Sequence, residues 1–186
     1  EKGIYFKLNP KVDDLPEKYA ARVDNIRIMV MGAVKKGGTG CYCPENALLS
    51  SLLSHLLIAR DEVVLIDMAA GIEHLSRGTA KSVDRLIIVV EPGSSSIETA
   101  LRIKIMSTEL GIENISIVGS KIHNEEEKDY IKDSLSGFDL LGFIPYDSAI
   151  QTADLGGNSV LDSSTRIKQA AEEIFNKISP NVTLSL

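Results

Sequence analysis

From Gly32 to Pro44 the sequence reads Gly-Ala-Val-Lys-Lys-Gly-Gly-Thr-Gly-Cys-Tyr-Cys-Pro, a glycine-rich loop that ends in both cysteines of the chain. An apolar run at 26–31 precedes it and a leucine-rich helical pattern at 44–58 follows, which is the strand–loop–helix setting of a phosphate-binding loop. Such a loop would continue with Lys and then Ser or Thr, but Cys41 and Tyr42 occupy those places. The loop therefore lacks the ammonium and the aliphatic hydroxyl that hold phosphates and Mg²⁺. We interpret it as a metal-binding loop.

The composition indicates one soluble domain, residues 1–186, that binds neither nucleic acid nor membranes. An apolar content of 44% and a charged content of 25% are typical of globular proteins. The net charge of −6 gives no general attraction for nucleic acid or anionic lipid, and no apolar run is long enough to span a bilayer. Two cysteines separated by one residue make no disulfide framework, so we expect a reducing, cytoplasmic setting.

Apolar runs alternate with helical patterns along the chain. The apolar runs predict strands at 26–31, 62–67, 85–90, 115–118 and 140–144. The helical patterns between and after them predict helices at 44–58, 95–111, 124–135 and 164–178. Continuous apolar strands of this kind lie in parallel sheets that are covered on both faces. The sequence therefore predicts an α/β fold with a doubly wound, mostly parallel sheet and helices on both faces.

The helix predicted at 95–111 carries the most explicit local signals. Ser95 and Glu98 have the spacing of a capping box, Ile97, Leu101 and Ile105 form an apolar stripe, and Gly111 supplies the stop.

Ligands in such folds bind beyond the carboxyl ends of the strands. The second predicted strand ends at this edge with an acidic residue, Asp67. Asp67 closes that strand in the way that P-loop NTPases place a carboxylate near Mg²⁺, and Gly71 could supply a backbone N–H to a γ-phosphate. It is equally open that Asp67 caps the next segment and that Gly71 makes a turn.

One further strand end carries candidate ligand-binding residues. Ser120 and Lys121 follow the fourth strand and could flank a purine base, with the lysine stem along the ring. The alternative is a solvated loop lysine. His55, His74 and His123 have no partners at metal-ligand spacing, so we assign them no catalytic role.

Cys41 and Cys43 are the candidate metal ligands. Both lie where a helix N-terminus favours the thiolate form, which is the form that binds metal. A closed tetrahedral site needs four ligands, and a symmetric dimer with this loop on its two-fold axis would supply four thiolates. The alternative is a pair of buried, inert thiols.

Several motifs together resemble the CooC-type carbon monoxide dehydrogenase maturation ATPases, nickel-insertion accessory proteins in the MinD and ParA class of P-loop NTPases. The motifs extend over nearly the whole chain and read Val30-Met31-Gly32, Gly40-Cys41-Tyr42-Cys43-Pro44, Asp67-Met68-Ala69-Ala70-Gly71-Ile72-Glu73-His74-Leu75, Arg77-Gly78-Thr79-Ala80, Val90-Glu91-Pro92 and Ile144-Pro145-Tyr146-Asp147.

The resemblance implies an ATP-dependent metallochaperone that helps insert nickel into carbon monoxide dehydrogenase, its client enzyme. Cys41 and Cys43 would bind Ni²⁺ or Zn²⁺ between the two subunits of a homodimer. Asp67 would serve catalysis at a site for ATP or ADP with Mg²⁺. The remaining contacts to the nucleotide would come from Gly71, Ser120, Lys121 and Pro145.

The sequence departs from that family in three places. The family's phosphate loop and its strand lie upstream of the region where this chain begins, at Glu1 rather than Met. Ala69 replaces an expected acid, and Ser120 replaces the asparagine that usually contacts the base. As written, the chain should not hydrolyse ATP. It is therefore either the C-terminal part of a longer ATPase or a metal-binding dimerisation module without turnover. A third reading, a MinD/ParA-type partitioning ATPase, does not require the Cys-x-Cys pair.

Overall fold

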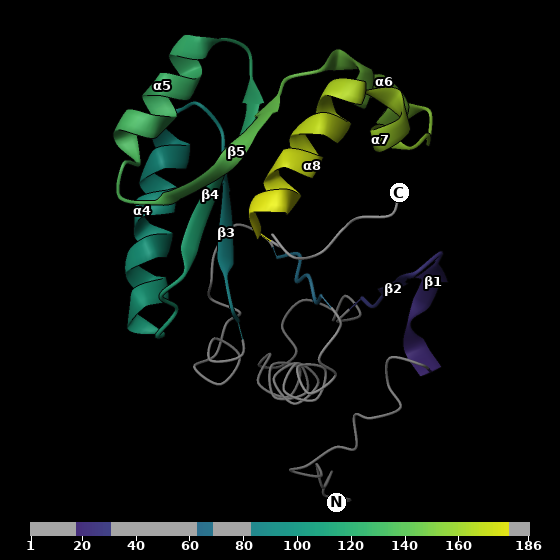
Figure 1. Ribbon diagram of the computed structural model, residues 1–186, viewed down its shortest axis with the longest axis horizontal. Helices are drawn as coiled ribbons and strands as arrows, with labels where there is room; N and C mark the ends of the chain where they lie inside the picture. The colour runs from purple at the N-terminus through teal and green to yellow at the C-terminus, as the bar shows by residue number, and fades with distance from the viewer. Residues whose placement is uncertain (1–17, 31–62, 69–82, 179–186) are drawn as a thin grey trace, which may run out of the picture. The chain divides into compact units, whose positions relative to one another are not determined.

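The computed structural model describes residues 18–30, 63–68 and 83–178, except for the side chains of residues 160 and 161 (Figure 1). By its internal contacts the chain divides into two compact units, residues 1–83 and 84–186, and each is described here by itself. That 1–186 forms a single domain stays a prediction. Within the described residues, no helix is both long and apolar enough to cross a membrane.

The C-terminal unit is a three-stranded parallel sheet with helices packed on it. Its sheet has the strand order β3-β4-β5, so each strand pairs with the one before it in the sequence. The elements are β3 (Leu86–Val90), α4 (Ser94–Glu109), β4 (Ile115–Ile122), α5 (Glu125–Ser134), β5 (Asp139–Pro145), α6 (Ser148–Leu155), α7 (Val160–Ser163) and α8 (Thr165–Ile178).

Two glycines show that α5 and α8 cover opposite faces of this sheet. A Cβ atom at Gly119 would overlap the ring of Phe143 and lie 3.3 Å from Cδ1 of Ile131 in α5. A Cβ atom at Gly142, which points to the other face, would lie 2.8 Å from Cγ1 of Ile174 in α8. Both positions need glycine because a helix or ring approaches the strand backbone closely. Figure 1 shows α4 on the same side as α5.

The core of the unit lies between these layers. It is made of aliphatic side chains from all three strands and from α4, α5 and α8, and its most buried members include Val90, Ala100, Ile117, Ile131 and Leu141. The predicted α/β fold with a parallel sheet and helices on both faces is confirmed.

A hydrogen-bonded polar network links the three strands at the amino edge of the sheet. The Arg85 guanidinium donates to Ser116 Oγ and to Asp139 Oδ2, each at 2.8 Å. Ser116 Oγ in turn donates to Asp139 Oδ2 at 2.9 Å, and the Ser116 side chain is buried. Residues at the start of all three strands are thus tied together on the side away from the candidate ligand-binding edge.

Most predicted elements of this unit are confirmed. Strands form at 86–90, 115–122 and 139–145, and helices form at 94–109, 125–134 and 165–178. The strand predicted at 115–118 is longer than expected because its pairing with β5 continues through Gly119 to Ile122. The helices α6 and α7 were not predicted, since each is short and carries few apolar residues at helical spacing.

The detailed prediction for α4 was wrong in two respects. Its N-cap is Gly93, which makes no side-chain cap, so the Ser95–Glu98 capping box does not form. The buried face consists of Ile97, Ala100, Ile103 and Ser107, whereas Leu101 and Ile105 are exposed. The buried face thus includes Ile97 from the predicted stripe but is otherwise made of residues outside it.

The N-terminal unit differs from the predicted parallel strands. The run predicted at 26–31 forms only the short strand β2 (Ile26–Ile28), which pairs antiparallel with β1 (Ala21–Val23). Asp24 adopts a φ of 51° in the two-residue turn between them, a conformation that Asp and Asn tolerate best among non-glycine residues.

The strand predicted at 62–67 does not form in the described residues 63–67, which pair with no strand in that part of the chain. Its Val63 and Leu65 are exposed, and a strand requires a partner for its backbone hydrogen bonds. The helix predicted at 44–58 lies outside the described residues.

Candidate functional site

The carboxyl edge of the sheet gathers the candidate residues of the C-terminal unit. Glu91 follows β3, Ser120 and Lys121 lie near the end of β4, and Pro145 ends β5. Because the three strands are parallel, these positions meet at one edge, as the sequence predicted (Figure 1).

A β-bulge lies at this edge in β4. Gly119 pairs with Phe143 and Ile122 pairs with Pro145, so Ser120 and Lys121 together stand opposite the single residue Ile144. Lys121 has a φ of 57°; among the described non-glycine residues only Asp24 shares a positive φ. Bulges redirect side chains and recur beside active sites, and a left-handed lysine is an uncommon conformation.

Lys121 reaches across the edge to the end of the neighbouring strand. Its Nζ lies 2.6 Å from Glu91 Oε1, although both side chains are more than half exposed, at 61% and 54%. The Glu91 backbone is itself fixed, because its N–H donates to Ser96 Oγ at 3.0 Å and its carbonyl accepts from Gly93 N at 2.8 Å. An ion pair thus bridges the ends of β3 and β4.

A second cluster follows β4 and β5. The rings of His123 and Tyr146 stack with centroids 4.6 Å apart and an angle of 19° between their planes. Glu127 Oε2 accepts from the His123 backbone N–H at 2.7 Å and lies 3.3 Å from its Nδ1. Asn124 caps α5 by accepting from Glu127 N at 2.9 Å, so the start of the helix holds the imidazole in place.

Asp147 joins two helices beside this edge. Its Oδ1 accepts from Ala149 N at 3.0 Å in the first turn of α6, and its Oδ2 accepts from Ser164 Oγ at 2.6 Å. Ser164 Oγ also accepts from Ile167 N at 3.3 Å in α8. The hydrogen bond from Ser164, followed by that from Ala149, lowers the pKa of Asp147 below its ordinary value. These contacts give the carboxylate a structural role.

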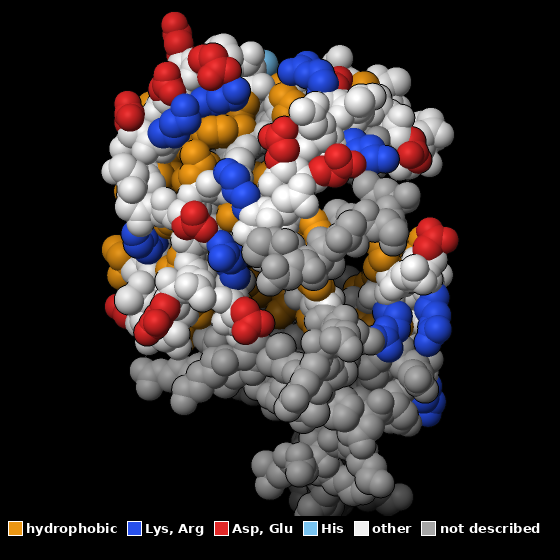
Figure 2. All heavy atoms as spheres, viewed as in Figure 1, with side chains coloured by type: hydrophobic (Ala, Val, Ile, Leu, Met, Phe, Trp, Pro, Cys, Tyr) orange, Lys and Arg blue, Asp and Glu red, His pale blue; other side chains and the backbone are white. Residues whose placement is uncertain are grey.

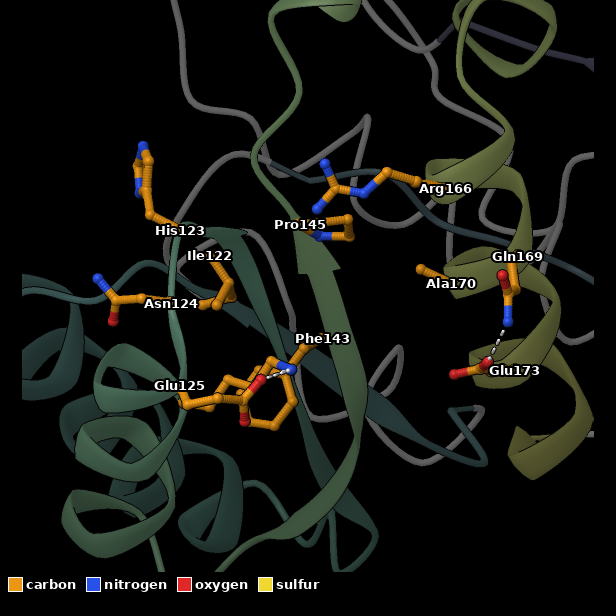
Figure 3. Close-up of a pocket in the computed structure, with 11 residues that line it drawn as sticks. Ile122, His123, Asn124, Glu125, Phe143, Pro145, Arg166, Gln169, Ala170 and Glu173 are labelled. Carbon is orange, nitrogen blue, oxygen red and sulfur yellow. Dashed lines mark hydrogen bonds and ion pairs between the residues drawn. The ribbon is translucent and has the colours of Figure 1, made fainter.

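A cavity of about 300 Å³ lies where α5, β5 and α8 meet (Figure 3). Arg166 extends from α8 toward Pro145, whereas Glu125 pairs with Lys128 at 2.6 Å and Gln169 donates to Glu173 at 3.2 Å. The lining is Ile122, His123, Asn124, Glu125, Lys128, Phe143, Pro145, Arg166, Gln169, Ala170 and Glu173. Its walls therefore offer cations, carboxylates and apolar surface together.

The surface of this unit carries no single dominant charge on the visible face. Figure 2 shows acidic and basic side chains intermingled over its described part.

The structure brings only some of the predicted site residues together. Ser120, Lys121 and Pro145 come together at the carboxyl edge of the sheet, although only Pro145 lines the cavity. Asp67 is exposed and belongs to the N-terminal unit. Gly71, Cys41 and Cys43 lie outside the described residues.

The part of the chain that the structure describes contains no group of three His, Cys, Asp or Glu side chains able to hold a metal ion. The metal site predicted at the two cysteines is not among those residues and stays a prediction.

The sequence alone did not identify Glu91, His123 and Arg166 as neighbours of the site. Glu91 gave one signal, an acid directly after a predicted strand, but its pairing with Lys121 depends on the strand register and on the bulge.

Known proteins resemble this chain over most of its length. No protein-family model matches it. It is 46% identical over 173 residues to the carbon monoxide dehydrogenase accessory protein CooC of Rhodospirillum rubrum, covering 93% of this chain and 66% of that protein. It is 45% identical over 179 residues to an uncharacterized ATP-binding protein of Methanocaldococcus jannaschii, covering 95% of this chain and 69% of that one. The chain thus spans about two thirds of the length of these relatives.

Solved structures with the same fold include a cell division protein complex and a ParA family ATPase. The MinC:MinD cell division protein complex of Aquifex aeolicus matches with a TM-score of 0.63 at 21% identity, over 76% of this chain and 62% of that one. A ParA family ATPase from Chlorobium tepidum matches with a TM-score of 0.67 at 19% identity, over 91% of this chain and 70% of that one. The fold is therefore that of the MinD and ParA class of P-loop NTPases.

Within that class, the sequence identities identify the family more narrowly. The chain belongs to the family that includes the accessory protein CooC and this ATP-binding protein of Methanocaldococcus jannaschii. The expected family resemblance is confirmed.

Proposed function

We propose that this chain is part of an ATP-dependent accessory protein that helps insert nickel into carbon monoxide dehydrogenase. The observation that carries the proposal is the 46% identity to the accessory protein CooC over 93% of the chain. Nickel is the cargo of the reaction and carbon monoxide dehydrogenase is the client enzyme.

In this proposal the nucleotide lies at the carboxyl edge of the sheet. Ser120, Lys121 and Pro145 flank the base, and the bulge that turns Lys121 across this edge supports that assignment. Asp67 holds Mg²⁺, and the Gly71 backbone N–H senses the γ-phosphate. When bound, Mg²⁺ neutralises charge on the phosphate oxygens during hydrolysis.

Cys41 and Cys43 receive the metal in this proposal. Each chain supplies two thiolates, so two chains in a homodimer complete a four-thiolate site for Ni²⁺ or Zn²⁺. Binding of ATP closes the dimer and tightens this site, and hydrolysis loosens it. The nucleotide cycle then supplies the free-energy difference that releases nickel to the client.

The test is the nickel content of carbon monoxide dehydrogenase purified from cells with and without the gene for this protein. We expect the client from the deletion strain to contain markedly less nickel, and a plasmid copy of the gene to restore it. A Cys41→Ser, Cys43→Ser copy that is expressed to the same level is the matched control and should not restore it. A client with full nickel content in the deletion strain would contradict the proposal.

A second candidate is a metal-binding dimerisation module that does not hydrolyse ATP. The observation that favours it is the absence of Lys and Ser or Thr after Gly40, where Cys41 and Tyr42 stand.

Calorimetry with Mg–ATP separates the two candidates. We expect the 186-residue chain to bind Mg–ATP weakly, and the protein translated from the whole gene to bind it tightly through an upstream phosphate loop. Weak binding by both proteins would favour the module. Tight binding by the 186-residue chain would instead make the loop at 36–41 a working phosphate site.

A further inference from the structure

We infer that Glu91 is a positioning residue of the nucleotide site, which holds Lys121 in the orientation that meets the base. The inference rests on the function proposed above and adds a residue to its site. Glu91 does not touch the nucleotide in this scheme; it acts through the lysine.

The first support is the backbone of Lys121. A lysine with a φ of 57° in a two-residue bulge occupies a conformation that glycine would adopt more easily. Such conformations persist where surrounding contacts enforce them, and they concentrate at ligand-binding sites. The described contact that fixes the Lys121 side chain is the ion pair with Glu91 at 2.6 Å.

The second support is the fixed backbone of Glu91. The Glu91 N–H donates to Ser96 Oγ in the first turn of α4, so the carboxylate starts from a backbone fixed to both β3 and α4. Lys121 lies in β4, the neighbouring strand. The ion pair therefore joins the end of the Lys121 side chain to an acid whose backbone position is fixed.

The exposure of the Glu91–Lys121 ion pair indicates that it contributes to ligand binding rather than to the stability of the fold. Both side chains are more than half exposed, and ion pairs of that kind add little to the stability of a fold. A lysine stem has several rotatable bonds, and holding it in one direction before a ligand arrives removes an entropic cost of binding. The stem then lies across the edge of the sheet, where its methylene groups can cover the face of a base.

The test compares four forms of the protein translated from the whole gene: wild type, Glu91→Gln, Lys121→Met and the double variant. Glu98→Gln is the matched control, because it removes a carboxylate from another exposed ion pair, that of Glu98 with Arg102 in α4. Calorimetry measures the affinity for Mg–ATP and for Mg–CTP, and thermal unfolding checks each variant's fold. The two nucleotides share their phosphates, but the purine offers the stem a larger ring face.

We expect Glu91→Gln to weaken Mg–ATP binding by about two- to five-fold, the range that exposed ion pairs span. Mg–CTP binding should weaken less, so the preference for ATP over CTP falls. Glu91→Gln should add no further loss to Lys121→Met, because the two changes act through one side chain. The control should bind both nucleotides as wild type does, and all melting temperatures should stay close to that of wild type.

The outcomes separate this inference from the proposed function. If wild type binds no nucleotide, both the nucleotide site and the positioning role of Glu91 are refuted. If wild type binds Mg–ATP and Glu91→Gln binds it equally well or more tightly, only the positioning role is refuted. Equal losses for ATP and CTP would also refute it, because they would place the effect on the phosphates.

Discussion

Asp147 is the residue whose ionisation state should be visible in the stability of the C-terminal unit. Its carboxylate accepts hydrogen bonds from Ser164 Oγ and Ala149 N, and these bonds lower its pKa below the ordinary value of 3.8. A group with a lowered folded-state pKa stabilises the fold above its unfolded-state pKa. That contribution is lost as the pH falls through the folded-state pKa.

We therefore expect Asp147→Asn to lower the melting temperature at neutral pH and to differ less from wild type in acid. The difference should shrink progressively at pH values below 3.8. Thermal unfolding followed by circular dichroism across that range measures it. Asp154→Asn, which changes an exposed carboxylate of the same helix, is the control and should show no such trend. A constant difference at all pH values would mean that the ionised state of Asp147 contributes nothing.

At the same scale, the candidate site was only partly predictable. The positions of Ser120, Lys121 and Pro145 at one edge follow from parallel strands alone. The left-handed conformation of Lys121 carries no sequence signal, because residues at positive φ are normally glycine, asparagine or aspartate. Its partner Glu91 depends on a contact between two strands, which local patterns do not encode.

At the scale of elements, periodicity predicted the strands and the long helices of the C-terminal unit, since buried parallel strands are continuous apolar runs. It did not predict which face of α4 is buried. Leu101 and Ile105 are larger apolar residues than Ala100 and Ser107, yet the smaller pair faces the sheet. Hydrophobicity alone could not anticipate the buried face, because large apolar residues occur both on it, at Ile97 and Ile103, and outside it.

The hairpin of β1 and β2 shows a second limit. Asp24-Asn25 between two triplets that alternate apolar residues with arginine is a hairpin signal, but the longer, mostly apolar run at 26–31 suggested a buried strand instead. All six residues of these two strands are exposed. The short-range turn chemistry was therefore the better guide to this segment.

At the scale of the whole molecule, the two cysteines make the most distinctive prediction. Two thiolates fill half of a tetrahedral shell, so we expect one divalent ion for every two chains and a dimer that forms more readily when metal is present. Because thiols must lose protons to bind metal, the affinity should fall as the solution is acidified. Metal analysis combined with sedimentation, with and without Ni²⁺, measures both effects.

Replacing Cys41 or Cys43 with Ser should reduce both metal uptake and metal-dependent association. Tyr42→Phe lies between the two cysteines, leaves both thiols in place and serves as the control. One ion per monomer would refute the shared site. So would a dimer that is indifferent both to metal and to the Cys→Ser changes, and the cysteines would then be inert.

The strand order of the C-terminal unit also bears on how the chain is made. Because β4 pairs with β3 and β5 pairs with β4, each strand leaves the ribosome when its neighbour already exists. The helix that covers β5 comes last, as α8. Among residues 84–178, which the structure describes in this unit, no strand has to be inserted between two that are already paired. The three strands can therefore pair one after another during synthesis, and α8 covers its face of β5 once it has been made.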